Sequence, residues 1–270
     1  MPVARLEDID VYYETAGAGP RLLYIGGTGA DLRRSPNVFD SPLTASFEVL
    51  SFDQRGMGRS GKPDVPYTMA GYARDALALL DHVGWSSCML MGYSFGGMVA
   101  QEVALAAPHR FSRLVLSATS SGGAGGASFP LHTLQGLDVT ERAKMMIRLA
   151  DRRRDQAWAD AYRQMYDVLV AQTEAILTFS QDQPGFEIGA RRQLEARKDH
   201  DTYDRLPLLP MPTLVVGGTH DDLAPESVVR ALAARIPGAQ VRFFNGGHLF
   251  HLQDRASWDV VIAFLNQEAL

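Results

Sequence analysis

The chain has 270 residues, of which 46% are hydrophobic and 21% charged, which suffices for one large core or a core with an insertion. Its formal net charge of −5 excludes the basic surface typical of nucleic-acid binding, so no nucleic-acid partner is expected. No run approaches about 18 apolar residues and no apolar signal segment opens the chain. We therefore expect no membrane partner and a cytoplasmic location.

Short apolar runs suggest the strands of one sheet. Residues 3–15 alternate apolar and polar side chains and indicate one or two half-buried strands. Six β-rich apolar runs follow, and short unbroken runs are typical of strands covered on both faces. These runs are 21–27, 47–53, 87–93, 113–119, 212–218 and 239–245.

Helical patterns separate these runs. Residues 68–84 place apolar side chains at i, i+3 and i+4 spacing and stop at Gly84. Similar patterns are found at 96–108, 225–238 and 255–267. Strands that alternate with helices predict an α/β fold with a mostly parallel, doubly wound sheet of about eight strands.

The alternation breaks after the sixth predicted strand. A Gly/Ser-rich stretch, 120–128, opens a region with no convincing strand, and we interpret this stretch as a hinge or a tight connection. Helical patterns follow at 138–154, 155–172 and 185–199. We therefore predict a core of 1–120 and 206–270 with a helical cap, or lid, at 121–205.

Residues 92–96 read Gly-Tyr-Ser-Phe-Gly between an apolar run and a helical pattern. A strand that turns sharply into a helix strains its central residue, and the close approach of the chain to itself requires neighbours without a Cβ. Such a turn would present the Ser94 hydroxyl beside a helix N-terminus, whose N–H groups can bind an oxyanion. The alternative is an ordinary Ser N-cap, and the motif alone does not decide between them.

A serine nucleophile needs a base, and the chain has seven histidines. His248 follows the last predicted strand on a glycine-flanked loop, at the same sheet edge as Ser94. His251 could instead pack or orient that loop. The two histidines form only a weak metal pair without a third ligand, so we expect no metal. The other histidines are His82, His109, His132, His200 and His220.

The base in turn needs an orienting carboxylate. Asp221 and Asp222 follow the strand at 212–218 on the expected edge, although either could serve only as a helix cap or a solvated charge. The order Ser94, Asp221, His248 brings three separate motifs into agreement, which favours a nucleophile over a cap at Ser94.

With these motifs the chain resembles the α/β-hydrolase fold superfamily over essentially its full length. The resemblance lies in four segments, GYSFGG, SFDQRGMGRSGKP, GGTHDDLAP and GGHLFHLQD. The family pattern G-x-x-D-x-x-x-P implies Asp221 rather than Asp222 as the acid. The resemblance also implies an oxyanion hole formed by the N–H groups of Phe95 and, by position, Thr28. The Thr28 loop departs from the family because it reads Gly-Gly-Thr rather than His-Gly-x.

Three other features are interpreted as structural. Residues 56–61 match the nucleotide-binding spacing G-x-G-x-x-G, but prolines follow where a helix should begin, so we expect no cofactor. The resemblance implies bracing roles for Asp53 and Arg55. The single cysteine, Cys88, is expected to be a buried small hydrophobe.

The expected activity is that of a serine hydrolase acting through an acyl-enzyme on a small to medium, largely apolar ester or lactone. Gly27, Met145, Trp158 and Tyr162 are expected to line the pocket for this small-molecule partner. Alternatives with the same residues are C–C cleavage of a diketone-type substrate and cofactor-free perhydrolysis or haloperoxidation. A non-catalytic small-molecule receptor is an alternative of another class. The sequence leaves a homodimer open.

Overall fold

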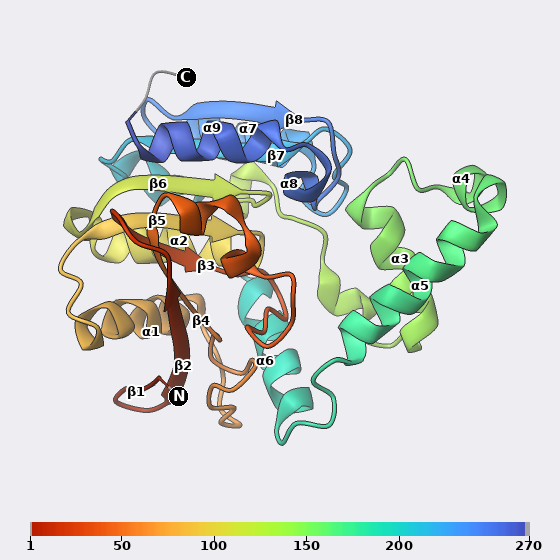
Figure 1. Cartoon of the computed structure of the whole chain (residues 1–270), viewed down its shortest axis with the longest axis horizontal. Coiled ribbons are helices and arrows are strands. Elements are labelled where there is room, and N and C mark those ends of the chain that lie inside the picture. The colour runs from red at the N-terminus through yellow and green to blue at the C-terminus, as the bar shows by residue number, and fades with distance from the viewer. Residues whose placement is uncertain (1, 268–270) are drawn as a thin grey trace.

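The computed structural model describes residues 2–267 and contains one eight-stranded sheet with helices on both faces (Figure 1). The strands are β1 Val3–Arg5, β2 Asp10–Ala16, β3 Arg21–Ile25, β4 Glu48–Phe52, β5 Cys88–Tyr93, β6 Phe111–Ser117, β7 Thr213–Gly218 and β8 Gln240–Phe244. Their spatial order is β1-β2-β4-β3-β5-β6-β7-β8. The pairs β1–β2 and β2–β4 are antiparallel and the others are parallel, which confirms the predicted mostly parallel sheet.

Two hydrophobic clusters cover the two faces of the sheet. One contains buried side chains of α1 (Met69–His82), α2 (Phe95–Ala106) and α7 (Glu226–Arg235). The other contains side chains of the 3₁₀ turn at Pro42–Ala45 and of α9 (Ala256–Leu265). The central strands are therefore buried on both sides, which is why they read as unbroken apolar runs.

The parallel strands bring the ends of β5, β7 and β8 to one edge of the sheet. Gly92 of β5 pairs with Leu116 of β6, and Gly218 of β7 pairs with Phe244 of β8. The loops that follow these strands carry Ser94, Asp221 and His248. Their gathering is thus a direct consequence of the topology.

A helical insertion follows β6, as predicted. It contains α3 (Val139–Ala150), α4 (Gln156–Ala161), α5 (Arg163–Thr178) and α6 (Phe186–Lys198). In Figure 1, α3, α4 and α5 project from one side of the sheet while α6 lies nearer to it. The pattern at 155–172 forms two helices rather than one continuous helix, because the backbone leaves helical geometry at Tyr162 (φ −122°, ψ 46°).

The helices of residues 2–267 include none with both the length and the apolar character needed to cross a bilayer.

Candidate active site

Ser94 occupies a strained turn between β5 and α2. Its backbone has φ 55° and ψ −120°, a conformation that a non-glycine residue rarely adopts. Its N–H donates to the carbonyl of Ser117 (2.8 Å), which ties the turn to the neighbouring strand β6. The Ser94 side chain makes no capping hydrogen bond to α2, so the simple N-cap interpretation does not describe it.

The glycines on either side permit this turn because the chain passes very close to itself. A Cβ at Gly96 would lie 2.1 Å from the carbonyl oxygen of Ile25, and one at Gly92 would lie 2.3 Å from the carbonyl oxygen of Gly96. These positions cannot hold a side chain without moving β3 or α2. The Gly-x-Ser-x-Gly spacing is therefore a packing requirement of this turn.

The His248 imidazole bridges Ser94 and Asp221. Its Nε2 lies 2.9 Å from Ser94 Oγ, and its Nδ1 lies 2.7 Å from Asp221 Oδ2. Asp221 is fully buried, and its other oxygen accepts the backbone N–H groups of Leu223 (2.7 Å) and Ala224 (2.9 Å). Because the carboxylate accepts the Nδ1–H, the Nε2 lone pair faces the Ser94 hydroxyl.

The last turn of α3 holds the loops that carry this bridge. The N–H of His248 donates to the carbonyl of Ala150 (2.5 Å), and the N–H of Asp222 donates to that of Leu149 (3.0 Å). These carbonyls lie at the C-terminal end of α3, where they lack intrahelical partners. The insertion thus contributes directly to the geometry of the site. The Asp222 side chain faces Arg152 (3.6 Å) instead of His248.

Thr28 and Phe95 lie beside Ser94. Phe95 is the first residue of α2, and a Cβ at Gly27 would lie 3.3 Å from the Ser94 Cβ, which brings the loop of Thr28 against the turn. In the part of the chain that the structure describes, neither backbone N–H donates to a protein acceptor. Two free amide donors near a hydroxyl are the arrangement that an oxyanion requires.

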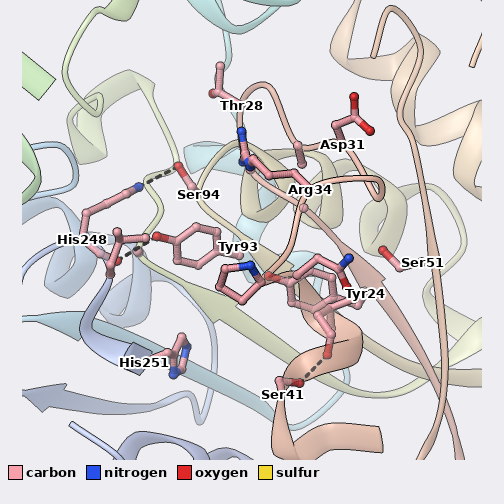
Figure 2. A pocket seen from close by; sticks show the side chains of 18 of the residues that line it. Tyr24, Thr28, Asp31, Arg34, Ser41, Ser51, Tyr93, Ser94, His248 and His251 are labelled. Atoms are coloured by element: carbon pink, nitrogen blue, oxygen red, sulfur yellow. Dashed lines mark hydrogen bonds between the residues drawn. The ribbon is translucent and has the colours of Figure 1, made fainter. Parts of the chain in front are cut away.

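A cavity of about 440 Å³ lies over Ser94 and His248. Figure 2 shows these two residues on one side of the cavity, and Tyr24 and Ser51 farther along it. Its wall is mostly apolar, which suits a ligand with an apolar body. The insertion contributes Ser128, Leu131, Met146, Ile176 and Arg197 to this wall.

The cavity wall contains one of the four residues predicted to bind substrate. Gly27 lines the cavity, whereas Met145, Trp158 and Tyr162 do not. Trp158 packs against the Tyr162 ring (centroids 5.6 Å apart) on the projecting part of the insertion (Figure 1). Met145 is 37% exposed, while Met146, about 100° farther around α3, lines the cavity.

A second serine–histidine contact involves His251, which lines the cavity. His251 Nε2 is 2.9 Å from Ser117 Oγ, and its Nδ1 is 2.9 Å from Ser257 Oγ. Ser257 donates its own hydroxyl proton to the Asp254 carbonyl (2.6 Å), so it accepts from Nδ1 and leaves Nε2 to accept from Ser117. Burial lowers the pKa of His251 to about 3. Because the Nδ1 of His251 faces a hydroxyl rather than a carboxylate and Ser117 is fully buried, this pair is a weaker candidate than Ser94 and His248.

Asp53, Arg55 and the glycine motif at 56–61 make contacts within the protein core. Asp53 accepts the N–H groups of Leu32 (2.7 Å) and Arg59 (2.8 Å), and a Cβ at Gly58 would collide with its carboxylate. Gly58 of the 56–61 motif therefore packs against a carboxylate of the chain itself, while Gly56 lies against Tyr67 and Gly61 against Ile9. Arg55 pairs with buried Asp75 (2.7 Å).

Cys88 is buried in β5, and this burial raises the pKa of its thiol to about 12. A thiol in that state is a packing residue.

The sequence profile that describes the alpha/beta hydrolase fold matches residues 20–255. The chain belongs to the α/β hydrolase fold family. This α/β hydrolase is 31% identical over 250 residues to a poly(3-hydroxyalkanoate) depolymerase from Ectopseudomonas oleovorans. The aligned region covers 92% of this chain and 84% of the depolymerase.

Solved structures share the fold of this α/β hydrolase across nearly its whole length. An enol-lactonase from Burkholderia xenovorans LB400 superposes with a TM-score of 0.80 at 22% identity, covering 99% of this chain and 100% of that one. A meta-cleavage product hydrolase from Pseudomonas fluorescens IP01 superposes with a TM-score of 0.76 at 20% identity, covering 96% and 95%. At these identities the two structures show the fold alone.

Proposed function

We propose that this α/β hydrolase cleaves carboxylic esters or lactones, with Ser94 as nucleophile, His248 as base and Asp221 as its orienting carboxylate. The observation that carries the proposal is the hydrogen-bonded chain from Ser94 Oγ through His248 to Asp221, at the wall of an apolar cavity. The backbone N–H groups of Thr28 and Phe95 form the oxyanion hole.

The geometry supports a two-step reaction. His248 Nε2 takes the Ser94 hydroxyl proton as Oγ attacks the substrate carbonyl, and the two N–H groups hold the oxyanion that develops. His248 then gives this proton to the departing alkoxide, leaving an acyl-enzyme. A water molecule, deprotonated by His248, hydrolyses the acyl-enzyme and restores Ser94. Asp221 fixes the imidazole tautomer and stabilises its protonated form.

Similarity to proteins of stated activity also favours an ester or lactone bond. The enol-lactonase and the depolymerase named above both resemble this chain over most of its length. The structural match to a meta-cleavage product hydrolase keeps C–C cleavage as the alternative to examine. The mostly apolar wall of the cavity supports a substrate whose acyl part is largely apolar.

A screen of acyl esters, lactones and vinylogous diketones against the purified protein tests the proposal. We expect turnover of an ester or a lactone, and Ser94→Ala should lower its kcat by about 10⁶. A loss of less than tenfold would show that Ser94 is not the nucleophile. Turnover of diketones alone would assign C–C cleavage instead.

Fluorophosphonate labelling with mass spectrometry locates the reactive serine. We expect the label on Ser94 in the native protein and in Ser117→Ala, and none on Ser94→Ala. A label on Ser117 would instead select the second serine–histidine pair. Labelled Ser94 without turnover of any compound in the screen would favour a receptor over an enzyme.

A further inference from the structure

Arg34 lies in the wall of the catalytic cavity, and its guanidinium forms no ion pair with the described residues. Figure 2 shows its guanidinium end directed toward the side of the cavity where Thr28 and Ser94 lie. Its side chain makes no hydrogen bond or ion pair within residues 2–267. Partial burial lowers the pKa of Arg34, and the charge of Asp31 offsets this only in part. A partly desolvated guanidinium with free donors is well suited to bind an anion that enters the cavity.

The carboxylates along the cavity are engaged elsewhere. Asp31 forms an ion pair with Arg33 and accepts the Ser180 hydroxyl (2.7 Å). Asp53 accepts two backbone N–H groups, as described above. Asp40 caps a 3₁₀ turn by accepting the N–H of Asn37 (2.8 Å). Within residues 2–267, Arg34 is therefore the lining arginine on the core side that forms no ion pair.

A second arginine faces the cavity from the insertion. Arg197 of α6 donates to Ser128 Oγ (2.7 Å) and to the Phe129 carbonyl (3.2 Å), both uncharged acceptors. Burial lowers the pKa of Arg197 to about 10, so it is still a cation near neutral pH. Its hydrogen bonds brace the insertion, and its charge adds to that of Arg34.

We propose that the substrate of this hydrolase carries a carboxylate, which Arg34 binds while the scissile carbonyl meets Ser94. The inference rests on the proposed function and adds its substrate class: an ester or lactone with an apolar body and one anionic group. A guanidinium matches a carboxylate through two parallel N–H···O bonds.

Two esters of equal chain length test this preference. Mono-p-nitrophenyl glutarate and p-nitrophenyl pentanoate differ in whether a carboxylate or a methyl group ends the acyl chain. We expect the native protein to favour the glutarate ester in kcat/KM by about 10- to 100-fold, the range of a charge-assisted hydrogen-bond pair. Arg34→Gln should reduce this ratio to within about threefold of unity. Arg34→Lys should retain part of the preference.

Matched variants distinguish loss of carboxylate recognition from a general loss of structure. Arg163→Gln removes an exposed arginine of α5 outside the cavity and should leave the ratio unchanged. Arg197→Gln should lower the ratio less than Arg34→Gln. Equal use of the two esters by the native protein, or an unchanged ratio in Arg34→Gln, would overturn the inference while the ester-hydrolase proposal stands.

If neither ester is cleaved, the hydrolase proposal fails for these compounds and binding decides the inference. Isothermal titration of pentanoate, which carries one carboxylate on an apolar chain, should then show binding to the native protein and about tenfold or weaker binding to Arg34→Gln. Binding of equal strength to both proteins, or to neither, would overturn the carboxylate site.

Discussion

The Tyr93 hydroxyl donates a hydrogen bond to the backbone carbonyl of His248 (2.8 Å), and the two rings lie 5.3 Å apart between centroids. Tyr93 directly precedes Ser94, so this bond joins the end of β5 to the loop that carries the imidazole. Burial holds the pKa of Tyr93 well above its usual value, so the hydroxyl keeps its proton as a donor. Tyr93 therefore positions His248 relative to Ser94.

Tyr93→Phe should lower kcat by about 2- to 12-fold and leave KM nearly unchanged. This range corresponds to one intramolecular hydrogen bond of about 0.5–1.5 kcal/mol. Steady-state kinetics with the best ester or lactone measures it. Tyr67→Phe is the matched control, because Tyr67 also donates to a backbone carbonyl, that of Pro63 (3.0 Å), and lies outside the cavity wall. Equal losses of kcat in the two variants would argue against a positioning role.

Asp221→Asn should reduce kcat by about 10⁴. The asparagine amide can donate where the carboxylate accepts, which favours the imidazole tautomer with its proton facing Ser94. Asp222→Asn should change kcat by less than about threefold, because Asp222 faces Arg152. Circular dichroism melts of both variants check that the fold is retained. A larger effect from Asp222→Asn would reverse the assignment of the acid.

The sheet, and the edge of it where the candidate active site lies, could be predicted from the sequence because both depend on patterns local to each segment. Apolar runs marked the central strands, and the rule that parallel strands end at one edge placed the loops of Ser94, Asp221 and His248 together. The Gly92 and Gly96 spacing was readable because steric exclusion at a sharp turn acts within a few residues.

The lid side of the cavity could not be predicted in the same way. Periodicity identifies α3 but does not say which of its faces meets the core, and one residue of rotation separates Met145 from Met146. The helix break at Tyr162 carries no glycine or proline signal. Arg34 lies in a loop whose path is fixed by tertiary contacts, such as the hydrogen bond from Leu32 to Asp53. Its position at the cavity follows only from the folded structure.

Gly96→Ala should destabilise the fold by about 3 kcal/mol or more. The added methyl group would lie 2.1 Å from the Ile25 carbonyl, so β3 and α2 would have to separate. Gly136→Ala is the control, since a Cβ there meets nothing within 4 Å and its φ is not positive. Urea unfolding of both variants gives the comparison. Equal stability would contradict the close approach at the turn.

Acid should weaken the fold through buried His251. Its folded pKa of about 3 lies below the ordinary value of 6.5, so the unfolded chain takes up a proton that the folded chain does not. The free energy of unfolding therefore falls as the pH drops from 6.5 toward 3, by up to about 1.4 kcal/mol per pH unit. His200, whose pKa burial lowers to about 4, acts in the same direction.

The pH dependence can be assigned to His251 by substitution. Between pH 7 and pH 5, His251→Asn should lose about 2 kcal/mol less unfolding free energy than the native protein, because the variant has no proton to take up at this position. His82→Asn, at an exposed position of α1, should keep the native dependence. Urea titrations at both pH values measure the slopes. An unchanged slope in His251→Asn would show that His251 is protonated equally in the folded and unfolded chains.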